Sequence, residues 1–403
     1  MKSSIVPFLK LAFLSTYPPR ECGIATFTQD LVRELKKKKH LKAGVVAVSD
    51  GKRDYGSDVL FDFPQQDRAR YGDTAQRINS SDIQLLVVEH EYGIFGGDSG
   101  EYLLDLIGKV RKPIVTTLHT VLPNPCEKQR EILKELCRRS ERVVTMAPNS
   151  RGILADVYGA DPAKIEVIHH GVPLFELPPR EALKKQFHLE NRTVVSTFGL
   201  ISPGKGLEYG IEAVALAAKK HPEILYLILG QTHPVIRKKF GEAYRTSLEK
   251  KVRELGIEGN VRFVNRYLEK EEIARWLKLS DIYMTPYLGR DQAVSGTLAY
   301  AVGYGRAVVS TPYLYAKEML SNGRGLLAGF EDAASLGSCI NFLIEHPEER
   351  RKMEEKALQL GKTMTWDAVA DRYIETFYRA LHDFREKNGE EHEDEEYQRQ
   401  AAE

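Results

Sequence analysis

The chain has 403 residues and a formal net charge of +1, a length that corresponds to roughly two to three domains and a charge that gives no indication of a nucleic-acid partner. The four cysteines are scattered, with neither a C-x-x-C pair nor a cluster with histidine, which argues against a disulfide framework and against a structural zinc site. No stretch reaches the ~18 uninterrupted apolar residues of a membrane span, so we expect a soluble, cytoplasmic protein.

The first half alternates short apolar runs with helical segments. Strands are expected at Leu11–Ser15, Gly44–Val48, Gln84–Val88, Ile114–Thr117, Val143–Met146 and Ile165–Ile168. Continuous runs of Val, Ile and Leu are typical of strands that are covered on both faces, and hence of a parallel sheet. After the first strand, Phe27, Leu31 and Leu35 follow at four-residue spacing and predict a helix. We therefore predict one doubly wound α/β domain over residues 1–175.

Residues 171–182 contain three prolines and predict a linker that acts as a hinge. The alternation then restarts, with strands expected at Val194–Gly199, Ile224–Gly230, Val261–Val264, Asp281–Met284, Ala307–Ser310 and Gly325–Ala328. This pattern predicts a second α/β domain over 176–366. A helix over about 367–385 is expected to pack back on the first domain, followed by an acidic, disordered tail at 386–403. Ligands of such paired domains bind in the cleft where the carboxyl ends of the strands meet.

The segment between Pro286 and Pro312 has the clearest local signals for an anion site. Ser295 can cap a helix whose first turn contains Gly296 and Thr297, where backbone N–H groups lack partners and attract anions. The following residues are small or apolar, which predicts a buried helix. A purely structural strand–helix–strand unit is the alternative interpretation of this segment.

Seven segments, in order along the chain, carry a family resemblance. They are STYPPRECGIATFTQDL (15–31), EHEYGIFGG (89–97), TTLHTVLPNP (116–125), VIHHGVP (167–173), FGLISPGKGLE (198–208), LGQTHP (229–234) and SGTLAYAVGYGRAVVSTPY (295–313). Together they resemble the retaining glycosyltransferases of family 4, most closely the mannosyltransferase-like members. The resemblance extends to about Arg385 and implies the GT-B fold, in which two Rossmann-like domains face one another across a cleft.

The resemblance implies a nucleotide-sugar donor, GDP-mannose, bound by the C-terminal domain. Lys205 would neutralise the diphosphate; the alternative is a surface lysine in a tight turn. Leu200 stands where the family usually has an arginine, and Arg290 and Arg266 are the candidates to replace that cation. Contact with the base is expected from the backbone near Asn265–Tyr267.

Two glutamates that are common in the family are absent here. Their positions are occupied by Gln292 and Tyr300, and neither side chain is a carboxylate. We expect Gln292, or Asp291 after a one-residue shift, to bind the donor sugar, and Tyr300 to make part of the ribose contact. Backbone N–H groups of Ser295–Thr297 would hold the diphosphate.

The N-terminal domain supplies further candidates. The resemblance implies that His119 contacts the transferred sugar. The alternative is a structural histidine at the end of a strand, with its hydrogen bonds made within the protein. His90 and Glu91 are expected to face the acceptor, with Glu91 orienting its hydroxyl; a capping or core-edge role is the alternative for both. Gly23 would let the diphosphate approach the backbone, and Arg20 is near enough in sequence to help.

No aspartate pair follows a strand as D-x-D, the pattern of a metal-held nucleotide. The resemblance implies that neither a metal nor another cofactor is required. The adjacent His169 and His170 point to opposite faces of a strand, so they do not indicate a metal site. The run Lys36–Lys39 is interpreted as a solvated helix end. The alternative is contact with an anionic membrane that carries a lipid-linked acceptor, which would place the protein at the inner membrane face.

The resemblance implies transfer with retention, by attack on the same face from which the diphosphate leaves. The protein then supplies positioning and charge stabilisation rather than a nucleophile. The expected acceptor is a glycan, a lipid-linked sugar or a small molecule. The alternatives are a glycosyltransferase that uses a UDP- or ADP-sugar, a glycan phosphorylase with a pyridoxal cofactor, an epimerase on the same fold, and a catalytically idle sugar-nucleotide-binding protein.

Overall fold

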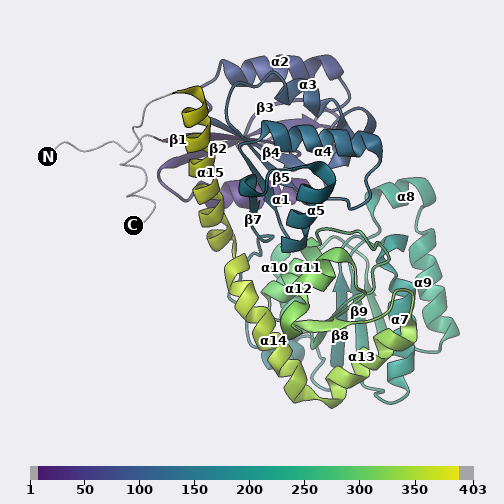
Figure 1. Cartoon of the computed structure of the whole chain (residues 1–403). Helices are drawn as coiled ribbons and strands as arrows, with labels where there is room; N and C mark the ends of the chain where they lie inside the picture. The colour runs from purple at the N-terminus through teal and green to yellow at the C-terminus, as the bar shows by residue number, and fades with distance from the viewer. Residues whose placement is uncertain (1–7, 390–403) are drawn as a thin grey trace. The chain divides into compact units, whose positions relative to one another are not determined.

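The computed structural model describes residues 8–389, which fold into two units. The first unit comprises the chain up to Gly171 and from Trp366 onward, and the second comprises Val172–Thr365 (Figure 1). Among the residues described, none of the helices combines the length and the apolar character that a membrane crossing requires.

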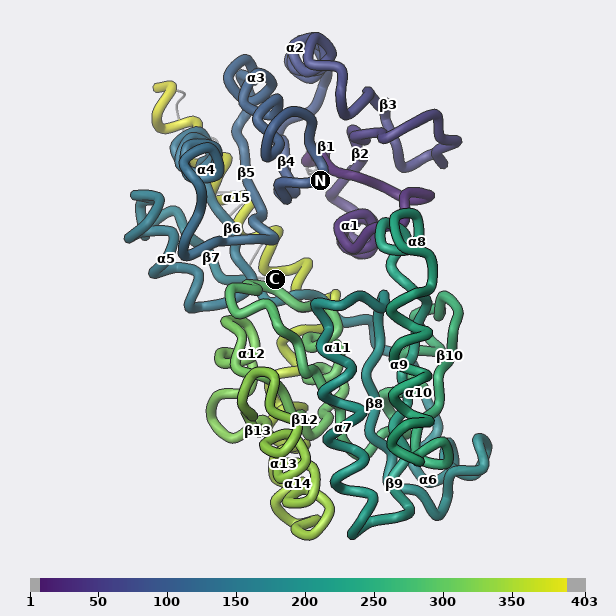
Figure 2. The backbone as a smooth tube through the Cα atoms, turned by 90° about the vertical axis from the view of Figure 1, so that its right-hand side faces the viewer, coloured from purple at the N-terminus to yellow at the C-terminus, as the bar shows by residue number. Residues whose placement is uncertain are grey.

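The first unit contains a seven-stranded parallel sheet in the order β3-β2-β1-β4-β5-β6-β7, and its strand labels follow this order in Figure 2. The strands are β1 (Leu9–Ser15), β2 (Leu41–Ser49), β3 (Val59–Pro64), β4 (Leu85–His90), β5 (Ile114–Leu118), β6 (Arg142–Thr145) and β7 (Ile165–Val167). The helices are α1 (Gly23–Leu35), α2 (Arg68–Asn79), α3 (Leu103–Ile107), α4 (Glu127–Arg139), α5 (Pro148–Tyr158) and α15 (Trp366–Asn388). Because β1 pairs with both β2 and β4, the chain winds outward in both directions from the middle of the sheet.

The second unit contains a six-stranded parallel sheet in the order β10-β9-β8-β11-β12-β13. Its strands are β8 (Thr193–Phe198), β9 (Ile224–Leu229), β10 (Val261–Val264), β11 (Ile282–Thr285), β12 (Ala307–Ser310) and β13 (Gly325–Leu327). Its helices are α6 (Arg180–Gln186), α7 (Leu207–Ala218), α8 (Pro234–Phe240), α9 (Ala243–Glu254), α10 (Lys270–Leu279), α11 (Gly296–Gly303), α12 (Leu314–Met319), α13 (Ala333–Glu345) and α14 (Pro347–Gly361). The predicted pair of doubly wound parallel sheets is thereby confirmed.

Helix α1 shows how the sequence specifies these elements. Cys22 caps its first turn, because its Sγ accepts a hydrogen bond from the backbone N–H of Ala25. The side chains of Phe27, Leu31 and Leu35 are buried, as their spacing predicts. Strand β3 was not predicted. It lies at the edge of the sheet and its burial alternates, so it lacks the continuous apolar run that identified the other strands.

The units divide at Gly171, not at residue 175. The backbone N–H of Val172 donates to the carbonyl of Met364 at 2.7 Å, which ties the start of the predicted linker into the second unit. On the other side of this boundary, a Cβ on Gly171 would lie 2.3 Å from the Trp366 ring. The chain passes from one unit to the other at 171–172 and again at 365–366, and these two places therefore lie side by side.

Helix α15 belongs to the first unit. The Tyr373 hydroxyl forms a hydrogen bond with the Thr117 hydroxyl at 3.1 Å, and the Phe377 ring meets that of Phe13 edge to face. The helix continues to Asn388, so the expectation of disorder from residue 386 is wrong for its first residues. The rest of the predicted tail, 390–403, lies outside the described residues.

Candidate active site

The loop that follows β8 places Lys205 beside an aromatic ring. This loop ends in a short 3-10 turn, Pro203–Lys205, immediately before α7. The Lys205 Nζ atom lies 3.8 Å from the centroid of the Tyr287 ring. The lysine is half-buried, and no carboxylate among the described residues forms an ion pair with it. Its positive charge is therefore available to a ligand.

Gly206 is the residue that allows this loop to approach the end of β11. Its φ is +58°, in the region that favours glycine, and a Cβ there would lie 2.2 Å from the carbonyl oxygen of Pro286. A side chain at this position would push the loop, and Lys205 with it, away from Tyr287.

The N-terminus of α11 lies at the same place. Ser295 caps the helix, its Oγ accepting from the backbone N–H of Leu298 at 3.3 Å. The Thr297 Oγ1 lies 3.1 Å from the Ser295 Oγ and 2.7 Å from the Tyr287 hydroxyl. The first turn of α11 contains no acidic residue. Lys205, three hydroxyl groups and a helix N-terminus thus converge at the carboxyl ends of β8 and β11, a combination suited to an anion.

The loop before α11 is held by its own hydrogen bonds. The Gln292 side-chain Nε2 donates to the carbonyl of Val294 at 3.0 Å, which leaves the side-chain carbonyl oxygen as the group that can meet a ligand. The side chains of Asp291 and Arg290 are exposed. The Arg290 guanidinium lies over the Phe330 ring at 4.2 Å from its centroid.

The remaining predicted residues of the second unit are spread along the edge of the sheet. The Tyr300 side chain is almost completely buried, with its ring 5.9 Å from that of Phe198 at the end of β8. Asn265 and Arg266 are exposed after β10. The Arg266 guanidinium forms a two-pronged ion pair with Glu272, which raises its pKa. Of the two candidates for the missing cation, Arg266 already has a counter-charge.

In the first unit, His119 is hydrogen-bonded to a buried carboxylate. It follows β5, and its Nε2 lies 2.8 Å from Oε2 of Glu89 on β4. The Glu89 side chain has no exposed surface and that of His119 is 7% exposed. The other Glu89 oxygen has no hydrogen-bond partner among the described residues. Glu89 therefore fixes the orientation of the imidazole.

The expectation that His90 faces the acceptor is wrong. Its side chain is completely buried, stacked on Phe95 with the edge of Tyr92 against it. Neither ring nitrogen has a hydrogen-bond partner among the described residues. Burial lowers the pKa of His90 to about 3, because the imidazolium form would lose its hydration. His90 is a neutral core residue, since both faces of the central strand β4 are covered.

Glu91 has the capping role that the sequence left open. Its Oε1 accepts from the backbone N–H of Tyr92 at 3.0 Å, and its Oε2 accepts from the Thr120 hydroxyl. The carboxylate thereby begins the 3-10 turn Tyr92–Ile94.

Arg20 and Gly23 lie near the carboxyl end of β1. The Arg20 guanidinium donates to Gln65 Oε1 at 3.1 Å and lies 3.5 Å from an Asp50 oxygen. These contacts involve the Nη1 and Nε atoms of the guanidinium. Gly23 is the first residue of α1, and a Cβ there would meet nothing within 4 Å. Internal packing does not require glycine at this position, and the space in front of it is open.

The lysine run 36–39 is largely neutralised. Lys36 pairs with Asp58, Lys37 pairs with Glu34, and Lys38 lies 2.7 Å from Asp371 and 3.0 Å from Asp367. These ion pairs favour the solvated helix end over a membrane-binding patch.

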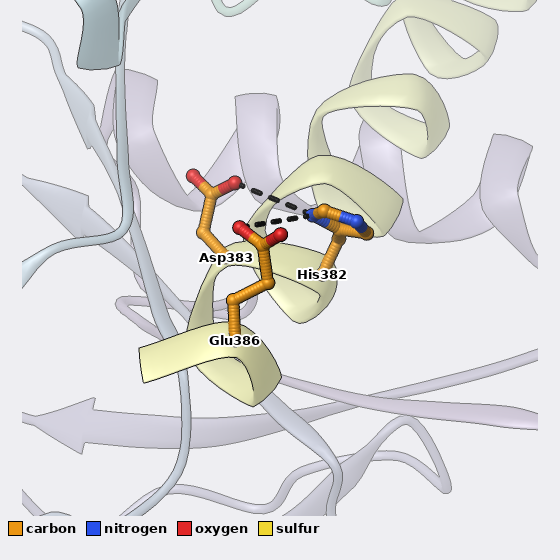
Figure 3. A group of neighbouring side chains, drawn as sticks. All are labelled: His382, Asp383 and Glu386. Atoms are coloured by element: carbon orange, nitrogen blue, oxygen red, sulfur yellow. Dashed lines mark ion pairs between the residues drawn. The ribbon is translucent and has the colours of Figure 1, made fainter. Parts of the chain in front are cut away.

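Figure 3 shows a group of possible metal ligands on α15: His382, Asp383 and Glu386. The Asp383 carboxylate is already paired with Arg142 of β6. One member of the group thus helps to attach α15 to the sheet, and the group lies far along the chain from the residues described above.

Two residues of these clusters were missed from the sequence. Tyr287 directly follows Pro286 at the end of a predicted strand, and Glu89 precedes the predicted pair of acceptor-facing residues. A polar side chain at the end of a strand is the signal that could have identified both. The contacts that identify their roles, with Lys205 and His119, join segments that are far apart in sequence.

Two family models and several curated proteins match this chain. The family model described as "Glycosyl transferases group 1" matches residues 179–360, and the model described as "Glycosyltransferase Family 4" matches residues 22–175. The D-inositol 3-phosphate glycosyltransferase of Nocardioides sp. is 26% identical over 245 residues, which are 58% of this chain and 52% of that protein. The enzyme of the same name from Streptomyces scabiei is 26% identical over 263 residues, 62% of this chain and 56% of that protein. The chain thus spans little more than half the length of these relatives.

Solved structures share the fold. Anabaena HepE in complex with UDP and glucose has a TM-score of 0.72 at 18% identity, covering 92% of this chain and 99% of that one. Sucrose-phosphate synthase from Thermosynechococcus elongatus has a TM-score of 0.71 at 16% identity, covering 93% of this chain and 99% of that one. Taken together, the two family models account for most of both units. The chain belongs to the group 1, or family 4, glycosyltransferases and has the GT-B fold.

Proposed function

We propose that the protein transfers a sugar from a nucleoside diphosphate donor to a hydroxyl group of an acceptor. The observation that carries this proposal is the convergence of Lys205 with the hydroxyl-capped N-terminus of α11. A cation without a counter-charge, next to unpaired backbone N–H groups, is suited to the two negative charges of a diphosphate.

The chemistry follows from the negative charge that develops on the diphosphate when its bond to the sugar breaks. The bond between the anomeric carbon and a diphosphate oxygen breaks, and a bond from the acceptor oxygen forms on the same face of the sugar. The leaving phosphate oxygen takes the proton of the acceptor hydroxyl. Lys205 and the N–H groups of Gly296 and Thr297 would stabilise the negative charge left on the diphosphate. This site supplies the charge from protein groups, so we propose that neither a metal nor another cofactor is needed.

The donor sugar is assigned to the loop before α11. The free carbonyl oxygen of Gln292 can accept hydrogen bonds from sugar hydroxyls, and the exposed carboxylate of Asp291 is the second candidate. His119 is proposed to contact the transferred sugar through the ring nitrogen that Glu89 does not use.

The resemblance to mannosyltransferases favours GDP-mannose as donor. The solved complex of HepE with UDP and glucose favours UDP-glucose as the second candidate, since HepE has the same fold. The acceptor is proposed to be a glycan, a lipid-linked sugar or a small molecule. The names of the curated relatives make a phosphorylated cyclitol a reasonable first small molecule to test.

Calorimetric titration with GDP, UDP and ADP, with EDTA present, tests the proposed donor site. We expect GDP or UDP to bind more tightly than ADP, and each diphosphate to bind more tightly than its nucleoside. Equal affinity for nucleoside and diphosphate would show that Lys205 and α11 do not form an anion site. An absorbance band of bound pyridoxal would instead favour a phosphorylase.

A further inference from the structure

We propose that Tyr287 is a positioning residue that directs both Lys205 and Thr297 toward the diphosphate. The inference rests on the proposed function and deepens it, because it says how one lysine can serve where the family usually has two cations. Tyr287 does not itself need to touch the ligand. Its ring holds the ammonium group, and its hydroxyl holds the side chain at the start of α11.

The two contacts of Tyr287 lie on different parts of the same side chain. The face of the ring meets the Lys205 Nζ at 3.8 Å from the centroid, well within the range of a cation–π interaction. The phenolic oxygen lies 2.7 Å from the Thr297 Oγ1, which in turn lies 3.1 Å from the Ser295 Oγ. One residue therefore connects the loop after β8 with the N-terminus of α11.

The ring of Tyr287 is itself fixed. The residue is completely buried, and its ring stacks on that of Tyr313 at a centroid distance of 5.5 Å and an interplanar angle of 17°. The Thr311 hydroxyl donates to the backbone carbonyl of Tyr287 at 2.5 Å. The Tyr313 hydroxyl lies 3.4 Å from the Thr285 Oγ1, on the strand that leads into Tyr287. These contacts restrain the position of the ring.

A fixed ring matters because lysine is a flexible side chain. An unrestrained lysine has to give up rotamer freedom when it binds a ligand, which weakens binding. A lysine that is already held over a ring has lost that freedom before the ligand arrives, and fixed charges are the ones that stabilise a transition state most effectively. With Leu200 in place of the usual arginine, the site has no second cation in this loop to compensate for a misplaced Lys205.

The simplest alternative is that Tyr287 only fills the core. A core residue, when replaced, would lower stability and weaken all ligands alike. A positioning residue would weaken the ligands that carry a diphosphate and leave the nucleoside unaffected. The comparison between these two kinds of ligand therefore separates the interpretations.

The test uses the full chain and two variants, Tyr287→Phe and Tyr287→Leu. Tyr315→Phe is the matched control, because Tyr315 is also completely buried and its hydroxyl has no hydrogen-bond partner among the described residues. Dissociation constants are measured by calorimetry for UDP, uridine, GDP and guanosine. The phenylalanine variant keeps the ring and loses the bond to Thr297, whereas the leucine variant loses both contacts.

We expect diphosphate affinity to fall severalfold in Tyr287→Phe and about tenfold or more in Tyr287→Leu, with nucleoside affinity within about twofold of wild type. The control should match wild type. The inference is overturned if both variants bind diphosphates like wild type, or if nucleoside and diphosphate affinities fall by the same factor. If the leucine variant does not fold, the phenylalanine variant decides on the same criterion. A wild-type protein that binds no diphosphate would instead refute the proposed function.

Discussion

Replacement of Lys205 by alanine removes the cation that the loop after β8 presents beside α11. Two unit charges about 4 Å apart interact by about 4 kcal/mol at an effective dielectric constant of about 20, and water entering the vacated space would recover part of this energy. We therefore expect the variant to lose about 3–4 kcal/mol of transition-state stabilisation, a fall in kcat/KM of roughly 10²–10³-fold.

The assay is steady-state release of the nucleoside diphosphate from the sugar donor. Lys250→Ala is the matched control, because Lys250 is an exposed lysine of the same unit that pairs with Glu254 at 3.2 Å, and such surface pairs contribute little. Circular dichroism establishes that both variants fold. If Lys205→Ala retains kcat/KM within about threefold of wild type, the lysine is not at the diphosphate and the reasoning fails.

Three further predictions concern the other residues. Burial lowers the pKa of His90 to about 3, so between pH ~6.5 and that value only the unfolded chain takes up a proton there. Stability is therefore greatest above pH ~6.5 and falls as the pH is lowered. Between pH 7 and pH 5, urea titrations should show that the free energy of unfolding of wild type falls by about 2 kcal/mol more than that of His90→Phe. Glu89→Gln keeps an acceptor for the His119 ring but removes the charge, so kcat should fall about tenfold with little change in KM; unchanged kinetics would make Glu89 purely structural. Gln292→Ala should lower activity more than about tenfold, whereas Tyr300→Phe should cost about 1 kcal/mol for one hydrogen bond; the reverse order of effects would contradict the assignment of the donor sugar to this loop.

The alternation of continuous apolar runs with helical segments was sufficient to predict the architecture. Strands such as β9 and β12 are buried along their whole length, so their sequences are continuous apolar runs that only a covered parallel sheet explains. Strand β3 was not identified by the same reasoning, because its burial alternates along the strand. The boundary between the units was predicted at residue 175 but lies at Gly171. It is set by contacts with Met364 and Trp366, which are distant in sequence.

The candidate site was predicted in part. The cap at Ser295 was predicted correctly, because a side-chain cap depends only on residues within one turn. His90 was expected to face the acceptor because it follows the predicted strand Gln84–Val88. What decides its burial is the packing of Tyr92 and Phe95 around it, which the local pattern does not contain. For the same reason Tyr287 was overlooked, since its two partners belong to other elements.

The central claim is that this site supports sugar transfer. The most direct measurement is to incubate the protein with GDP-mannose and UDP-glucose separately, with an acceptor panel that includes inositol phosphates, and to quantify both the free nucleoside diphosphate and the glycosylated product by mass spectrometry. We predict that one donor yields equal amounts of both products with wild type and at least a hundredfold less with Lys205→Ala. A wild-type protein that binds the nucleoside diphosphate tightly yet consumes neither donor would contradict the claim and favour a sugar-nucleotide-binding protein without catalytic activity.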